Sequence, residues 1–477
     1  MFASYSRRVF RPLVYSSVFL FLVFCQTSFG QTTSPSPLTA ANPKPSQKGK
    51  MPVIVIPGLL GSELVNKETD ETVWFDIARS KDDDLRLPIS SNLAANRDKL
   101  VPRDILRNIK YLRFFPETEI YQKAATSLEV PGDYMEGKWD APTENGYQDT
   151  YYVFPYDWRR DNVENARLLI NRIDELKRKL KRPDLKFNII AHSMGGLIAR
   201  YAAMYGDADL PAGARRPVPT WAGVTRINKI FLVGTPNEGS ITSLDAMING
   251  YPIGPKGINI PFVQDLTEFD MFTIPAIFQL LPHSGTIRAF DENLKPLRVD
   301  IYSPATWEKY GWAAYTEPDF AKHFTVQEQS QAKAYFRVAL NRARRFHEAL
   351  NANISRKSPV EIYLLGSDCK PTLDAMIIRR DGKKGVWRTQ FKADGFKRSD
   401  DTKVSGKELE DLLFAKGDGV VTERSFLTST LSGARVRAGN YRAALPVSDV
   451  SFECEVHNRL LSNEVVQNKL FADLISK

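Results

Sequence analysis

One segment, Phe187 to Arg200, restricts the fold of this chain more than any other. It opens with an apolar run, passes through Ala191-His192-Ser193-Met194-Gly195 and ends in residues that suit a helix. A small-x-Ser-x-Gly turn between a buried strand and a helix is typical of a nucleophile elbow, which holds the serine hydroxyl clear of the backbone. The alternative, a nucleotide-binding turn, lacks its Gly and Lys pattern here. The segment therefore predicts an α/β sheet that presents Ser193 as a nucleophile.

The rest of the sheet follows from apolar runs of strand length. Pro52 to Pro57 is a continuous apolar run, as expected for a strand buried on both faces of a parallel sheet. Further strands are expected at Thr150 to Phe154, Phe187 to Ala191, Asn228 to Val233, Val360 to Leu365 and Val447 to Phe452. From Val163 to Leu180, apolar residues recur at helical spacing. Alternating strands and amphipathic helices predict an α/β fold with a mostly parallel central sheet.

Two stretches are too long to be simple crossovers between neighbouring strands. They are residues 76–148 and 237–357, and we expect both to form cap or lid insertions over one rim of the sheet. The second contains apolar runs such as Phe272 to Phe278, which suit a cap for acyl chains or a cap that only packs onto the core. The catalytic domain is therefore expected to span residues 51–477.

The first fifty residues have a different character. Arg7, Arg8 and Arg11 precede an apolar run from Leu13 to Cys25, and the small residues Ser28 and Gly30 occupy the −3 and −1 positions of a cleavage before Gln31. This layout predicts a signal peptide at residues 1–30, because the run is too short to span a membrane; an uncleaved anchor is the alternative. Residues 31–50, rich in Pro, Ser, Thr and Lys, predict a flexible linker. We expect an exported protein that is secreted, periplasmic or associated with the envelope.

Composition excludes several classes of protein. Hydrophobic residues make up 43% and charged residues 25% of the 477 residues, which rules out a disordered chain and a polytopic membrane protein. The net charge of +9 suits an ordinary soluble surface as well as contact with anionic lipids, and no nucleic-acid-binding motif occurs. Cys369 and Cys454 remain after the predicted cleavage. In an oxidising compartment they can pair, but the sequence does not establish the required geometry.

A serine nucleophile needs a neighbouring base, and the chain has five histidines. His457 is the strongest candidate, because it follows the last expected strand, where the final loop of such a sheet delivers the base. His192 adjoins the serine, so we expect its side chain to point away and to be structural. For the acid, Asp418 lies between two glycines in an expected turn, whereas Asp368 directly follows a strand and is the alternative.

A site for a developing negative charge is expected beside the serine. The segment Pro57-Gly58-Leu59-Leu60-Gly61 ends the first strand, and its glycines let the backbone approach a ligand closely. In this architecture the oxyanion donors are the N–H after the nucleophile and one N–H from an early loop. We therefore expect the backbone N–H groups of Met194 and Leu59 to bind the oxyanion.

Together these segments resemble the lecithin:cholesterol acyltransferase family of lipid acyl hydrolases and acyltransferases, within the α/β-hydrolase superfamily. Besides the elbow, the matching stretches are Val53 to Ser62, Phe154 to Arg159, Leu232 to Pro236, Leu280 to Pro282, Gly417 to Val421 and His457 to Asn463. The resemblance implies Ser193, Asp418 and His457 as a catalytic triad. It also implies Leu59 and Met194 as the backbone oxyanion donors.

The resemblance implies a serine-dependent O-acyltransferase or a phospholipase-type acyl hydrolase. A lipid ester would acylate Ser193, and water or an alcohol would accept the acyl group, without a metal or cofactor. Two alternatives stay open: a carboxylesterase for small soluble esters, and a non-catalytic surface-binding protein that retains the fold. Ala191 and the polar stretch from Asp381 to Lys416 depart from the family pattern, so the substrate is less determined than the chemistry. Tyr156 to Arg159 is expected to be structural, with a packed Trp and an Asp–Arg pair.

Overall fold

The computed structural model describes residues 49–76, 85–109, 118–253, 265–283, 285–352, 358–381, 385–428, 436–438, 441–443 and 445–475. The predicted signal peptide, residues 1–30, and all but the last two residues of the predicted linker lie outside these ranges. Within the described ranges, no helix has both the length and the apolar character needed to cross a membrane.

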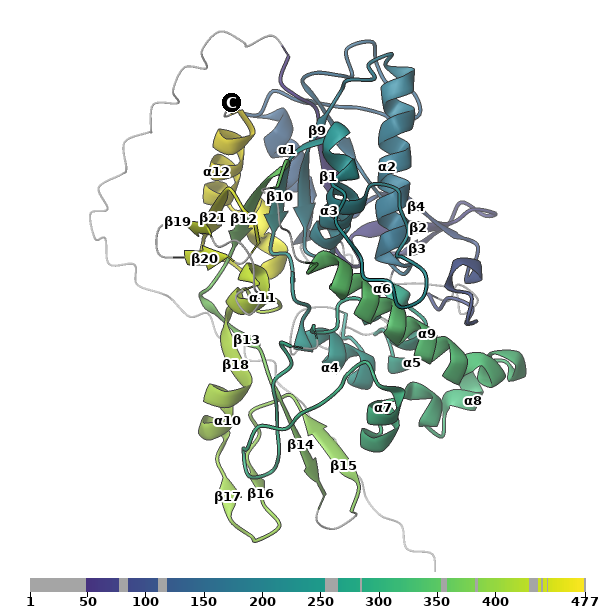
Figure 1. Cartoon of the computed structure of the whole chain (residues 1–477), viewed down its shortest axis with the longest axis vertical. Coiled ribbons are helices and arrows are strands. Elements are labelled where there is room, and N and C mark those ends of the chain that lie inside the picture. The colour runs from purple at the N-terminus through teal and green to yellow at the C-terminus, as the bar shows by residue number, and fades with distance from the viewer. Residues whose placement is uncertain are drawn as a thin grey trace, which may run out of the picture. The chain divides into compact units, whose positions relative to one another are not determined.

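A seven-stranded parallel sheet forms the centre of the fold (Figure 1). Its strand order is β21-β12-β10-β9-β1-β8-β7, and every neighbouring pair is parallel. The bounds are β1 Val53–Ile56, β7 Met135–Glu136, β8 Thr150–Val153, β9 Phe187–His192, β10 Ile227–Val233, β12 Glu361–Gly366 and β21 Asp449–Phe452. Six of these strands were predicted. The seventh, β7, has only two residues and therefore leaves no apolar pattern in the sequence.

Helices cover both faces of the sheet. They are α1 (Gln122–Glu129), α2 (Asn162–Lys179), α3 (Met194–Tyr205) and α12 (Glu464–Ile475). From β1, Ile54 and Ile56 join the apolar cluster that includes residues of α2 and α3, whereas Val53 and Val55 join the cluster with α1 and α12. Successive side chains of a strand point to opposite faces, so an all-apolar strand packs on both sides. This arrangement confirms the predicted α/β-hydrolase fold.

The predicted helix at Val163 to Leu180 is α2. It begins after Asp161, whose carboxylate accepts a hydrogen bond from the N–H of Val163. Three basic residues occupy its last turn, where they favour the negative end of the helix dipole. The apolar residues that recur at helical spacing from Val163 to Leu176 are buried in the core, as the spacing predicted, whereas Leu168 is exposed.

The two long segments differ in what they build. Residues 237–357 carry α4 (Ile241–Asn249), α5 (Glu268–Phe272), α6 (Pro275–Phe278), α7 (Pro304–Tyr310), α8 (Phe320–His323) and α9 (Val326–Leu350). Residues 76–148 carry α1, which packs on a face of the central sheet rather than over its rim. A small antiparallel sheet has the strand order β3-β2-β4. Strands β2 (Ser62–Asn66) and β3 (Thr72–Trp74) precede the segment 76–148, and β4 (Leu100–Ile105) lies within it.

A third excursion leaves the sheet between β12 and β21. Its main elements are β13 (Lys370–Leu373), β14 (Met376–Arg380), β15 (Trp387–Gln390), β16 (Phe396–Lys397), β17 (Lys403–Val404), α10 (Gly406–Leu413), β18 (Phe414–Gly417) and α11 (Glu423–Leu427). Strands β13 and β18 pair antiparallel, so the chain leaves and returns side by side (Figure 1). Ile377, Leu409 and Leu413 belong to a separate apolar cluster here. The stretch from Asp381 to Lys416 thus contains regular elements that share an apolar core with β14 and Phe290.

Candidate active site

Ser193 lies directly after β9, in the turn predicted as a nucleophile elbow. Its φ is 53° and its ψ is −125°, the strained positive-φ backbone of such a turn. A Cβ added to Gly195 would lie 2.4 Å from the carbonyl oxygen of Pro57, and one added to Gly196 would lie 2.0 Å from Thr235 Oγ1. Both glycines are therefore needed for α3 to begin so close to the loops that follow β1 and β10.

The structure brings the side chains of Ser193, Asp418 and His457 together. His457 Nε2 lies 2.9 Å from Ser193 Oγ, and His457 Nδ1 lies 2.7 Å from Asp418 Oδ2. The backbone N–H of His457 also donates to the carbonyl oxygen of Asp418 at 3.0 Å. In this arrangement the imidazole can accept the serine proton while the carboxylate fixes its orientation. Asp368, the alternative acid, makes no hydrogen bond or ion pair with His457 among the described residues.

The environment of Asp418 keeps its carboxylate ionised. The residue is 2% exposed, and its Oδ1 accepts hydrogen bonds from the N–H groups of Val420 at 2.9 Å and Val421 at 2.7 Å. Burial by itself would raise the pKa of Asp418. The His457 ring and the two backbone N–H groups outweigh burial and hold the pKa below its ordinary value. Asp418 is thus an anion that can stabilise a protonated imidazole.

The loop between β1 and β2, residues 57–61, contains the predicted oxyanion donor Leu59, and we call it the oxyanion loop. It approaches the serine closely. A Cβ added to Gly58 would lie 2.8 Å from Ser193 Cβ, so only glycine permits this contact. Next to it, the N–H of Leu59 has no hydrogen-bond acceptor among the described residues, and neither has the N–H of Met194 at the first position of α3. The two predicted oxyanion donors thus have no acceptor among the described residues, and the glycine that precedes Leu59 contacts Ser193.

Aromatic side chains fix the backbone of this loop. Tyr121 OH accepts from Gly58 N–H at 2.8 Å, Tyr156 OH donates to Pro57 O at 2.9 Å, Trp74 Nε1 donates to Leu60 O at 2.8 Å and Trp158 Nε1 donates to Ser62 O at 3.2 Å. Each of the four aromatic side chains is nearly or fully buried, where a hydrogen bond is expensive to lose. Tyr156 and Trp158, expected to be structural, therefore support the predicted oxyanion loop directly.

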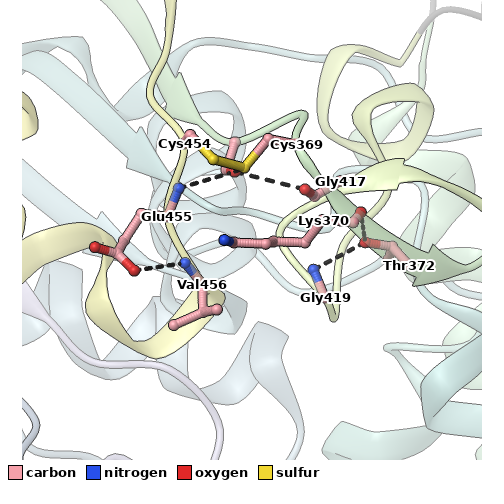
Figure 2. Close-up of a disulfide and its surroundings, with 9 residues drawn as sticks. Cys369, Lys370, Thr372, Gly417, Gly419, Cys454, Glu455 and Val456 are labelled. Carbon is pink, nitrogen blue, oxygen red and sulfur yellow. Dashed lines mark hydrogen bonds between the residues drawn. A yellow bond between two sulfur atoms is a disulfide. The ribbon is translucent and has the colours of Figure 1, made fainter. Parts of the chain in front are cut away.

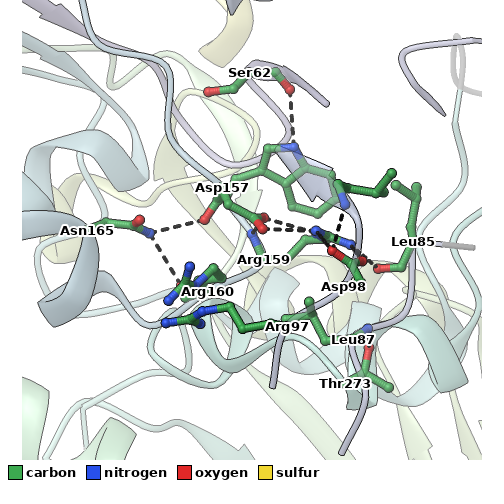
Figure 3. A network of polar contacts seen from close by, with 12 residues as sticks. Ser62, Leu85, Leu87, Arg97, Asp98, Asp157, Arg159, Arg160, Asn165 and Thr273 are labelled. Atoms are coloured by element: carbon green, nitrogen blue, oxygen red, sulfur yellow. Dashed lines mark hydrogen bonds and ion pairs between the residues drawn. The ribbon is translucent and has the colours of Figure 1, made fainter. Parts of the chain in front are cut away.

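The same stretch contains a fully buried cation, Arg159 (Figure 3). Its guanidinium pairs with Asp157 at 2.9 Å, as the sequence predicted, and also with Asp98 at 2.9 Å. It donates a further hydrogen bond to the carbonyl oxygen of Leu85. A buried charge needs partners on every side, and Asp98 and Leu85 come from the segment 76–148. The network ties that segment to the end of β8.

A disulfide joins the loop that carries the candidate base, His457, to a strand that pairs beside the candidate acid, Asp418 (Figure 2). Cys369, just before β13, is bonded to Cys454, three residues before His457. Thr372 Oγ1, on β13, accepts a hydrogen bond from the N–H of Gly419, next to the acid. The pairing that the sequence left open thus forms beside the candidate acid and base and fixes the two loops relative to one another.

Two residues near the site were not recognised as such in the sequence. Gly234, with φ of 58°, follows β10, and a Cβ there would lie 3.2 Å from His457 Nδ1. Tyr121 comes from the segment 76–148 and contacts both the oxyanion loop and His192. No local pattern marks Tyr121, because its partners are more than sixty residues away in sequence.

Comparisons with known proteins identify the family of this chain. The family profile described as lecithin:cholesterol acyltransferase matches residues 139–425, more than half of the chain. A search of curated proteins found no match. Solved structures with a similar fold include the Tle4-Tli4 complex, at 15% identity over 89% of this chain and 98% of that chain, with a TM-score of 0.54.

Two other solved structures are similar at lower scores. Lipase BlEst2 of Bacillus licheniformis, in mature form, is 12% identical over 90% of this chain and 96% of that chain, with a TM-score of 0.33. Phospholipase PlaB of Legionella pneumophila is 9% identical over 89% of this chain and 63% of that chain, with a TM-score of 0.26. At such identities the likeness concerns the fold alone. On the profile match, the chain belongs to the lecithin:cholesterol acyltransferase family, whose members are lipid acyl hydrolases and acyltransferases.

Proposed function

We propose that the chain is a lipid acyl hydrolase or O-acyltransferase that works through an acyl-Ser193 intermediate. One observation carries the proposal: the His457 ring bridges Ser193 Oγ at 2.9 Å and Asp418 Oδ2 at 2.7 Å. These distances let one imidazole take a proton from the serine while the buried carboxylate stabilises the resulting charge.

The reaction proceeds in two halves. Ser193 Oγ attacks the ester carbonyl while its proton passes to His457 Nε2, and the developing oxyanion binds the N–H groups of Leu59 and Met194. His457 then gives that proton to the departing alcohol, which leaves acyl-Ser193. In the second half, water or an acceptor alcohol loses its proton to His457 as it attacks the acyl carbonyl. Collapse of this second oxyanion releases the product, and the proton returns to Ser193.

Family membership and the second insertion support a lipid as the acyl donor. Phe272, Ile277 and Phe278 of this insertion are buried in a continuous apolar cluster that also contains core residues of α3. This burial shows that the insertion packs onto the core, which is compatible with a cap over an apolar acyl chain, so family membership carries the proposal of a lipid donor. The basic and apolar pattern of residues 1–30 supports export, so the proposed lipid substrate lies outside the cytoplasm.

Product analysis by mass spectrometry tests this proposal. Purified enzyme and the Ser193→Ala variant are incubated with phospholipid vesicles that contain a long-chain alcohol or a sterol. Ser193-dependent release of fatty acid identifies a phospholipase, and faster formation of acylated alcohol identifies an acyltransferase. If neither product appears while short soluble esters are cleaved, the lipid assignment is wrong and the chain is a carboxylesterase. If no ester of any kind is cleaved, the catalytic assignment is wrong.

A further inference from the structure

We propose that Tyr121 and His192 are positioning residues that join the oxyanion loop to the catalytic histidine through one chain of hydrogen bonds. The proposal rests on the proposed function. The chain runs from Gly58 N–H to Tyr121 Oη at 2.8 Å, from Tyr121 Oη to His192 Nδ1 at 2.9 Å, and from His192 Nε2 to the carbonyl oxygen of His457 at 3.0 Å.

The chemistry of the two ends fixes the direction of every bond. The backbone N–H of Gly58 can only donate, so Tyr121 Oη accepts there and its own proton is free for His192 Nδ1. The carbonyl oxygen of His457 can only accept, so His192 Nε2 must carry a proton. One neutral tautomer of His192, protonated at Nε2, satisfies all three bonds at once. A doubly protonated ring would place a second N–H against the phenol and reverse the middle bond.

Burial keeps both side chains of the hydrogen-bond chain neutral. Tyr121 is 2% exposed and His192 is 6% exposed. Burial, reinforced by the nearby His457, lowers the pKa of His192 to about 3, and burial raises the pKa of Tyr121 above its ordinary value. Both side chains therefore remain neutral at neutral pH. They orient the groups around them and take no part in the proton transfer.

The chain completes the fixation of the catalytic histidine. The backbone N–H of His457 is bonded to Asp418, its ring is bonded at both nitrogens, and its carbonyl oxygen is bonded to His192. At the other end, Gly58 directly precedes the proposed donor Leu59. Neither Tyr121 nor His192 forms a hydrogen bond to Ser193 or to the His457 ring, although the His192 and His457 ring centroids lie 4.9 Å apart. Through the hydrogen bonds to Gly58 and to the His457 carbonyl, the two residues set the distance between the base and the oxyanion donors. Misplacement of catalytic groups by about 1 Å costs on the order of 100-fold in rate.

The kinetics of four variants test the hydrogen-bond chain, with a short-chain chromogenic ester as the substrate. Tyr121→Phe and His192→Phe each break it, whereas His192→Gln retains an N–H near the Nε2 position. We expect each Phe variant to lower kcat by about 10- to 100-fold with KM changed less than about twofold, since positioning acts on the transition state. The double Phe variant should lose no more than the worse single variant, because both substitutions break the same chain. His192→Gln should restore part of kcat.

Tyr152→Phe is the matched control. Tyr152 is fully buried on β8, and its hydroxyl donates to the carbonyl oxygen of Gly146 at 2.8 Å, outside the chain. This variant should lower the melting temperature but not kcat. Unchanged kcat in Tyr121→Phe, or losses that multiply in the double variant, would overturn the proposal. If His192→Phe does not fold, the kcat values of Tyr121→Phe and His192→Gln decide. Unchanged kcat in Tyr121→Phe would still overturn the proposal. A wild-type enzyme without Ser193-dependent turnover would instead refute the proposed function. The catalytic role of the hydrogen-bond chain would fall with it.

Discussion

The two halves of the site are held in place by different means. Ser193 and the oxyanion loop follow β9 and β1, which lie inside the central sheet and are paired on both sides. His457 follows β21 at the sheet edge, and Asp418 follows β18, which is not part of this sheet. The nucleophile half relies on buried strands and aromatic hydrogen bonds, whereas the acid–base half has the Cys369–Cys454 disulfide. A crosslink thus appears where the support of the sheet ends.

The largest expected effect separates the two candidate acids. Asp418→Asn leaves the shape of the acid–base half intact but favours the wrong tautomer of His457, so kcat should fall by about 10⁴-fold. Asp368→Asn is the matched control and should change kcat by less than about twofold. Steady-state kinetics on a soluble ester measures both. A large loss in Asp368→Asn with a small loss in Asp418→Asn would reverse the assignment of the acid.

Removal of the disulfide should affect the acid–base half first. The bond closes a loop of 85 residues, and its loss in Cys369→Ser/Cys454→Ser should cost about 2–4 kcal/mol of stability. Denaturant unfolding followed by fluorescence measures this cost. Activity should disappear at a lower denaturant concentration than the fluorescence change, because the loops of His457 and Asp418 loosen before the central sheet unfolds. Coincident transitions in this variant, as sharp as those of the wild type, would contradict the comparison.

Acid should weaken the nucleophile half at higher pH than the acid–base half. Burial holds the pKa of His192 at about 3, below its unfolded value of about 6.5, so its contribution to stability is complete above pH ~6.5 and is lost as pH falls toward 3. The pKa of Asp418 is also depressed, and its contribution is lost only below its unfolded pKa of about 4. Between pH ~6.5 and pH ~4, the free energy of unfolding should fall by about 1.4 kcal/mol per pH unit for each buried histidine.

His347 on α9 adds to the same pH dependence of stability. It is fully buried, and burial lowers its pKa to about 3. Urea denaturation at a series of pH values from 7 to 4 measures the summed slope. His192→Gln and His347→Gln should each flatten it by about one proton equivalent. A slope that neither substitution changes would show that these rings are not buried as neutral groups.

A smaller effect tests the aromatic support of the oxyanion loop. Tyr156→Phe removes hydrogen bonds to the carbonyl oxygens of Pro57 and Gly58. A buried hydrogen bond contributes about 0.5–1.5 kcal/mol, so kcat should fall by about two- to tenfold. Tyr335→Phe is the control, because the buried Tyr335 hydroxyl has no hydrogen-bond partner among the described residues. An equal fall in kcat in both variants would mean that the loop does not depend on Tyr156.

The sequence predicts well whatever depends on a local pattern. The apolar runs around β1 and β9 and the helical spacing of α2 each reflect burial of neighbouring residues, and the elbow is a single strained turn. The groups that support the site depend instead on partners far away in sequence. Asp98 pairs with Arg159 across 61 residues, and Tyr121 meets His192 across 71 residues. Nothing local marks such pairs.

Burial of single polar residues is equally hard to read from a pattern. His192 was expected to be structural, which its burial agrees with, but its bond to the His457 carbonyl follows only from the folded arrangement of β9 and the last loop. Likewise, the segment 76–148 looked like a rim insertion, whereas α1 packs on the sheet. Its short apolar face, Ala124, Ala125 and Leu128, is too brief to reveal this packing in the sequence.

The most direct test of the central claim is labelling with a fluorophosphonate, followed by peptide mass spectrometry. The account predicts one adduct, on Ser193, that forms in the wild type, is lost in Ser193→Ala and forms far more slowly in His457→Ala. The slow reaction follows because the hydroxyl then has no base at 2.9 Å. No adduct on Ser193 in the wild type, or equally fast labelling of Ser193 in His457→Ala, would contradict the account.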